Sequence, residues 1–165
     1  MAAADIFLSF KGPDVKGESL DKVHNGMIEC LSFGWGEANQ GTAGTGGGAG
    51  AGAVVKHDLS ISKYVDKSSN VLFQACAAGT HYSGATLYVR KSGGDPLDYL
   101  QFDLGGVVFI AGYTVNGTGG DGVVPVETIN INFTTLMMTY NQQAATGGGA
   151  GPAPLGYDFG QATKL

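Results

Sequence analysis

Apolar and polar residues alternate along most of this chain. The clearest case is Glu127 to Thr135, where Ile129, Ile131 and Phe133 share one side and polar residues share the other. A period of two is typical of a strand with one buried and one solvated face. The same pattern recurs at Ile6/Leu8/Phe10, at Leu59/Ile61 as far as Val65, at Leu87/Val89 and at Leu100/Phe102/Leu104. The run 107–115 is apolar on both faces, which is typical of a central or interface strand.

The best helix candidate is one short segment, residues 69–78. Its apolar residues at helical spacing are Val71, Leu72, Ala75 and Cys76. Asp66, Ser68 or Ser69 can act as the N-cap, and Gly79 is a C-terminal stop. Seven or more strands with one flanking helix predict an all-β fold, a β-sandwich or barrel closed by hairpins, in a single domain over residues 1–165.

Two segments have low complexity. Residues 38–53 are mostly glycine and alanine, and residues 141–156 combine a run of three glycines with Pro152 and Pro154. Neither can form a core, so both are predicted to be flexible. Long loops of this kind are usually mobile linkers or dedicated contact elements. A third glycine-rich stretch, residues 116–122, fits an ordinary hairpin turn between two strands.

The charge balance limits the partners. Nine Lys and Arg against fourteen Asp and Glu give a net charge of -5, and Arg90 is the only arginine. This composition argues against a nucleic-acid partner. No apolar stretch approaches the ~18 residues of a membrane helix, and residues 1–10 lack the pattern of a cleaved signal peptide, so we expect no membrane insertion. Cys30 and Cys76 are predicted to be buried free thiols, which suits a reducing cytosol.

Catalytic and cofactor motifs are weak. The glycines at 46–48 lack the Gly-Lys-Ser/Thr of a phosphate loop. His24, His57 and His81 lie in different segments, and none has a second ligand-type residue at metal spacing that could chelate with it. We therefore expect no catalytic residue, no metal and no cofactor. The open alternative is a small β-sandwich hydrolase or metal-dependent enzyme that uses His81 or His57.

The segment 27–36 is read as one strand with two unlike faces. Its bulky side, Leu31, Phe33 and Trp35, is expected in the core, and its other side is small: Ser32, Gly34 and Gly36. Glycine in a strand often means that something approaches closely. A neighbouring backbone is one candidate for that close approach.

Several motifs follow one another in a fixed order. They are Lys16-Gly17-Glu18-Ser19 with Asp21 and His24, then 33–36, 63–69, 79–81, 90–94 and Tyr157-Asp158-Phe159. In this order the chain resembles the Hcp family, the ring-forming tube subunits of the bacterial type VI secretion apparatus. A phage-type tail tube protein is the alternative within the same assembly class.

The resemblance implies a structural protein. It implies a homo-hexamer that stacks into a tube, a spike protein at the tip, a contractile sheath, and small effector proteins in the channel. It also implies residence in the bacterial cytoplasm before firing, followed by secretion without a cleaved signal peptide.

The resemblance also gives the small strand face a possible role as channel lining: Ser32, Gly34 and Gly36. The glycine-rich segment is predicted to stack one ring on the next, through Gly41, Thr42, Thr45 and Gly47. Five charged residues are candidates for subunit boundaries: Lys63, Asp66, Lys67, Arg90 and Lys91. The alternative for these five is a set of surface ion pairs that contribute roughly 0–1 kcal/mol each.

Overall fold

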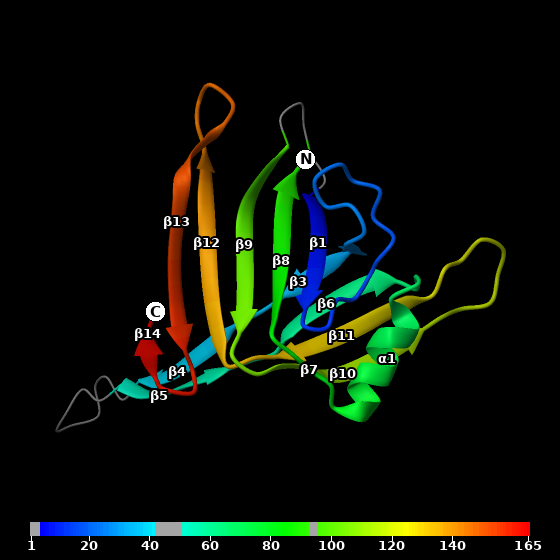
Figure 1. The fold of residues 1–165 in the computed structure, drawn as a ribbon, viewed down its shortest axis with the longest axis horizontal. Coiled ribbons are helices and arrows are strands. Elements are labelled where there is room, and N and C mark those ends of the chain that lie inside the picture. The colour runs from blue at the N-terminus through cyan, green and yellow to red at the C-terminus, as the bar shows by residue number, and fades with distance from the viewer. Residues whose placement is uncertain (1–3, 42–50, 93–95) are drawn as a thin grey trace.

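Two large antiparallel β-sheets form the frame of the molecule. The computed structural model describes residues 4–41, 51–92 and 96–165. Figure 1 shows the larger sheet standing upright and the smaller one running across its base. The all-β prediction with a single short helix is confirmed.

The larger sheet has seven strands in the order β14-β13-β12-β9-β8-β1-β2. Their bounds are β1 Ala4–Lys11, β2 Ile28–Cys30, β8 Gly84–Lys91, β9 Leu97–Gly105, β12 Thr135–Gln143, β13 Gly149–Asp158 and β14 Thr163–Lys164. The smaller sheet has five strands in the order β3-β6-β11-β10-β7. Their bounds are β3 Ser32–Gly34, β6 Leu59–Tyr64, β7 His81–Tyr82, β10 Val108–Asn116 and β11 Val126–Asn132.

The core lies between these two sheets. Leu8 and Leu87 come from the larger sheet and Ile61, Ile129 and Ile131 from the smaller one, each with at most 1% of its surface exposed. Burying a side chain of this size contributes about 1.5–3 kcal/mol. The alternation predicted for 127–135 is therefore confirmed, because its apolar side is the side that faces the core.

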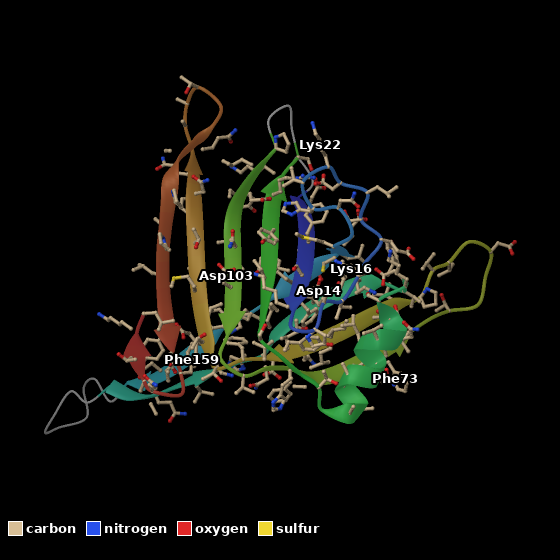
Figure 2. All side chains as sticks on the ribbon, viewed as in Figure 1. Asp14, Lys16, Lys22, Phe73, Asp103 and Phe159 are labelled. Atoms are coloured by element: carbon tan, nitrogen blue, oxygen red, sulfur yellow. The ribbon has the colours of Figure 1, made fainter. Side chains whose placement is uncertain are left out.

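The only helix in the described part of the chain, α1, spans Ser69–Ala78 as predicted. Ser68 is its N-cap, and Gly79 ends it in the left-handed conformation, with φ of 64°. The helix packs against β10 and buries Leu72 and Ala75. Phe73, labelled in Figure 2, remains 57% exposed, and its ring centroid lies 6.1 Å from that of Tyr113 on β10.

The expectation of one strand over 27–36 is wrong. The chain leaves the larger sheet after β2 and joins the smaller sheet as β3, so Leu31 lies at the change of sheet and is 46% exposed. Phe33 and Trp35 are half-buried and pack against the core as expected. The segment is two strands, because β2 pairs with β1 in the larger sheet and β3 pairs with β6 in the smaller sheet.

Where the structure describes them, both low-complexity segments are mostly paired strand, and residues 144–148 form the turn between β12 and β13. Residues 37–41 form β4 (Glu37–Gly41), which pairs with β5 (Ala51–Lys56) in a two-stranded sheet. Residues 135–158 form the hairpin of β12 and β13. Backbone pairing needs no apolar side chains, so a sequence without core residues can still form these strands. Residues 42–50 lie outside the described part of the chain.

Candidate subunit interface

The loop between β1 and β2, residues 12–27, is held against the larger sheet, and we call it the anchored loop. The Gly17 amide donates to the Gly26 carbonyl at 2.8 Å, and the Gly26 amide donates to the Ser19 carbonyl at 2.8 Å. A Cβ on Gly17 would lie 2.2 Å from the carbonyl oxygen of Met27. Only glycine fits there, which gives a physical reason for the glycine of the Lys16-Gly17-Glu18-Ser19 motif.

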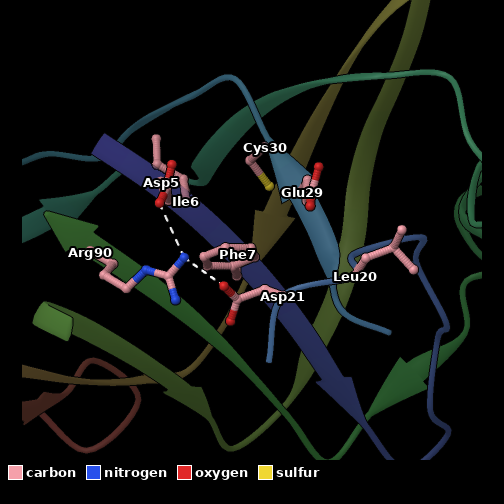
Figure 3. Close-up of a pocket in the computed structure, with 8 residues that line it drawn as sticks. All are labelled: Asp5, Ile6, Phe7, Leu20, Asp21, Glu29, Cys30 and Arg90. Atoms are coloured by element: carbon pink, nitrogen blue, oxygen red, sulfur yellow. Dashed lines mark hydrogen bonds and ion pairs between the residues drawn. The ribbon is translucent and has the colours of Figure 1, made fainter. Parts of the chain in front are cut away.

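Asp21 fastens the anchored loop through Arg90. One carboxylate oxygen of Asp21 accepts from the amides of Val23 and His24, and the other accepts from Arg90 Nη2 at 2.7 Å. The same Arg90 nitrogen lies 3.1 Å from Asp5 Oδ2 (Figure 3). The hydrogen bond from Arg90 holds the pKa of Asp21 well below its ordinary value, and the two carboxylates raise the pKa of Arg90. A cavity of about 320 Å³ lies beside this cluster.

His24 is the second fastening of the anchored loop. Its ring is 2% exposed and lies between Phe7 and Tyr88, with centroid distances of 4.5 and 4.7 Å. Its Nε2 is 2.9 Å from Asp98 Oδ1 on β9. The histidine predicted only as part of a family motif is therefore a packing residue that ties the loop to three strands.

Lys63 and Glu127 form a second charge cluster, inside the protein. Both side chains are 0% exposed, and Lys63 Nζ is 2.7 Å from Glu127 Oε2 and 2.9 Å from Asp66 Oδ1. Tyr113 donates its hydroxyl to the other Glu127 oxygen. Burial, together with this bond, raises the pKa of Tyr113 to about 12.

The predicted boundary role of Lys63 is corrected by this cluster. Its ammonium is fully enclosed within one chain, so it cannot contact a neighbouring subunit or act as a surface ion pair. Arg90 is similarly occupied, since it is 8% exposed and paired to Asp5 and Asp21. Lys67 and Lys91 are exposed, and their role at a boundary stays a prediction.

The predicted channel and stacking residues lie in separate places. Ser32 and Gly34 are exposed on β3, where a Cβ on Gly34 would meet nothing within 4 Å, and Gly36 is half-buried near His57. Gly41 is the exposed last residue of β4. Thr42, Thr45 and Gly47 lie outside the described residues.

Within the described residues, His57 and His81 of the enzyme alternative do not form part of a cluster of ligand-type or catalytic side chains. His57 is exposed between β5 and β6, and exposed His81 has its ring centroid 5.9 Å from that of Phe109. Within residues 4–41, 51–92 and 96–165 no three His, Cys, Asp or Glu side chains come together as metal ligands. None of the helices in these ranges has the length and apolar character that crossing a membrane needs.

The apolar face of the larger sheet continues beyond its cover, a feature that sequence reasoning missed. Met138 pairs across β12 with buried Phe102 on one side and with Leu155 on the other, so all three share the core-facing side. Phe102 is 6% exposed, but Met138, Tyr140 and Leu155 are 45%, 51% and 80% exposed. We call these three residues the uncovered face. The sequence signal was the apolar side of 136–140, which was not counted as a strand.

This all-β chain uses its charge clusters within its own fold and leaves an apolar face uncovered. An uncovered apolar face is typical of a subunit that contacts other chains. The comparisons place it more narrowly. A family model described as "Type VI secretion system effector, Hcp" matches residues 7–140. Protein hcp1 of Pseudomonas aeruginosa is 39% identical over 161 residues, which are 96% of this chain and 97% of that protein.

Solved structures agree with the family match. One, described as a type six secretion system protein, has a TM-score of 0.90 at 28% identity and covers 99% of this chain and 100% of that one. Hcp1 from Salmonella typhimurium has a TM-score of 0.79 at 32% identity over the full length of both chains. The chain belongs to the Hcp family, and it is a tube or effector component of type VI secretion.

Proposed function

We propose that this chain is the subunit of a homo-hexameric ring that stacks into the inner tube of a type VI secretion system. The observation that carries the proposal is the uncovered face. Met138 and Leu155 continue the core of the larger sheet, yet each is largely exposed in the single chain. Because burial of each such side chain contributes about 1.5–3 kcal/mol, a second copy that covers them stabilises the assembly.

The tube carries small effector proteins in its channel, with a spike protein at its tip and a contractile sheath around it. The small side chains of Ser32 and Gly34 support a channel role for this part of β3, since both are exposed and leave free space. The β4–β5 hairpin is the stacking element, through Gly41, Thr42, Thr45 and Gly47. Its described arms carry almost no buried residue, so its contacts are expected outside its own subunit.

The charges that we assign to the subunit boundary are Lys67 and Lys91. Asp66 is occupied within its own chain, because its side chain is 12% exposed and it is bonded to Lys63 and Ser68. Complementary charges at a boundary set register and reject wrong partners. The protein waits in the bacterial cytoplasm and leaves without a cleaved signal peptide. The comparisons favour type VI secretion over a phage tail tube, because the family model and the solved structure with a TM-score of 0.90 are both described as type VI secretion proteins.

Light scattering on the purified protein tests ring formation. We expect a mass six times the 16.8 kDa of one chain, with rings visible by electron microscopy. A stable monomer at tens of micromolar would refute the proposal. For the channel, replacing Gly34 with a large residue should leave rings intact and lower the recovery of a co-expressed small cargo protein. Equal recovery would remove β3 from the channel wall.

A further inference from the structure

The larger sheet carries unlike surfaces at its two ends. The anchored loop joins β1 to β2 at one edge, and the uncovered face lies on β12 and β13 near the other edge. Figure 2 shows Lys22 of the loop and Phe159, next to β13, at opposite ends of this sheet. A head-to-tail contact between copies needs two different surfaces on each subunit, and closes into a ring when the rotation allows.

The anchored loop presents apolar side chains outward. Its polar residues Ser19 and His24 are 1% and 2% exposed, whereas Leu20 and Val23 are 92% and 67% exposed. Leu20 cannot turn inward, because Ser19 before it and Asp21 after it are both hydrogen-bonded into the fold. A leucine on a loop already held in place loses little freedom on binding, which is the property of an interface anchor.

The outer edge of β13 cannot pair freely with another strand. The Gly156 carbonyl accepts from the Leu165 amide, so the backbone groups of Gly156 point away from β12, toward the outer edge of β13. The backbone groups of residues two positions apart in a strand point to the same side. Pro152 and Pro154 therefore face outward and offer no N–H. Because the edge lacks these two donors, a strand added there forms fewer hydrogen bonds, which favours a neighbour that packs on the uncovered face.

Beside each apolar surface lies one exposed charged residue, and these two residues have opposite signs. Exposed Lys22 lies between Leu20 and Val23 in the sequence. Exposed Glu37 lines two cavities that share Tyr157, of about 410 and 190 Å³, and Met138 and Leu155 line the smaller one. An apolar surface with a lysine thus matches an apolar surface with a carboxylate.

We propose that Leu20 and Val23 of one subunit pack on the uncovered face of the next, with Lys22 beside Glu37 of that neighbour. This pairing rests on the proposed ring and names the two surfaces that form it. The second copy is the occupant because each chain displays both halves of the contact, one at each end of the same sheet.

Chemical cross-linking tests the pairing directly. In a chain with Cys30→Ser and Cys76→Ser, we add Leu20→Cys and Leu155→Cys and treat the rings with a short bis-maleimide. We expect covalent species up to six chains, whereas either cysteine alone should give no species beyond a dimer. Rings by light scattering without this ladder would overturn the pairing and leave the ring proposal intact. An absence of rings in the unmodified protein would instead overturn the proposed function.

A second measurement uses Leu20→Asp with Val71→Asp as its control, because Val71 is another exposed apolar residue, on α1, at 42% exposure. We expect Leu20→Asp to weaken association at least about tenfold while Val71→Asp does not. Circular dichroism checks that both variants fold. Equal association of Leu20→Asp and unmodified protein would overturn the pairing.

Discussion

The buried pair of Lys63 and Glu127 gives the sharpest prediction about stability. Lys63→Met keeps the length of the side chain and removes its charge. In the native protein the Lys63 ammonium donates to the Tyr64 carbonyl at 2.8 Å, to Glu127 at 2.7 Å and to Ser69 Oγ at 3.3 Å. The variant leaves the Glu127 carboxylate fully buried, with the Tyr113 hydroxyl as its remaining polar partner among these groups.

The cost follows from burial. Removing one member of a buried ion pair costs about 3–5 kcal/mol, because the other charge stays buried without compensation. This is a large part of a typical folding stability of about 5–15 kcal/mol. The double variant Lys63→Met/Glu127→Leu removes the two fully buried charges and should recover part of the loss. The rest persists because Asp66, at 12% exposure, still lacks its ion pair with Lys63, and the Tyr113 hydroxyl lacks its acceptor. Lys16→Met is the matched control, because the Lys16–Asp14 pair is largely exposed and should contribute only about 0–1 kcal/mol.

Urea unfolding followed by circular dichroism measures these differences. All variants are compared at one chain concentration, because association adds to apparent stability. A loss below about 1 kcal/mol for Lys63→Met, equal to that for Lys16→Met, would refute the reasoning. A double variant no more stable than Lys63→Met would show that the two charges are not coupled.

Three further predictions concern the anchored loop and its neighbours. Gly17→Ala should destabilise the protein by about 1–3 kcal/mol in urea unfolding, whereas Gly34→Ala, which has open space around its Cβ, should stay within about 0.5 kcal/mol. Because Arg90 holds the pKa of Asp21 below its ordinary value of 3.8, the stability advantage over Asp21→Asn should be full above that value. It should shrink progressively as the pH falls below 3.8 toward the lower folded-state pKa, in unfolding curves from about pH 6 to about pH 2. Burial raises the pKa of Cys30 to about 12, so a thiol reagent at about pH 8 should modify Cys30 far more slowly in the native protein than in urea, and equal rates would contradict its burial.

Local patterns in the sequence predicted the elements that local forces determine. The helix over 69–78 matched in both bounds, because its apolar spacing and the Gly79 stop both lie within a few residues of it. The strand containing Ile129 and Ile131 matched because every second residue reports the same buried face. The ordered motifs predicted the family, and several of their residues, such as Gly17 and Asp21, hold the anchored loop in place.

Contacts between distant segments were not predictable from these patterns. Lys63 reads as a surface charge in its own segment, and its partner Glu127 lies 64 residues further along the chain. The change of sheet at Leu31 has no local signal either, because an uninterrupted alternation fits one strand as well as two. Arg90 is likewise explained only by Asp5 and Asp21, which come from β1 and the anchored loop.

The glycine-rich hairpins show why a segment without core residues can still have a defined role. β4 and β5 satisfy their backbone groups through each other, and β13 satisfies one edge through β12, so neither needs apolar side chains to form. Such arms gain little from their own subunit and extend beyond the core (Figure 1). The stability that these arms add therefore depends on contacts with a second copy of the chain. We expect them to have their role in the assembled protein and not in the single chain.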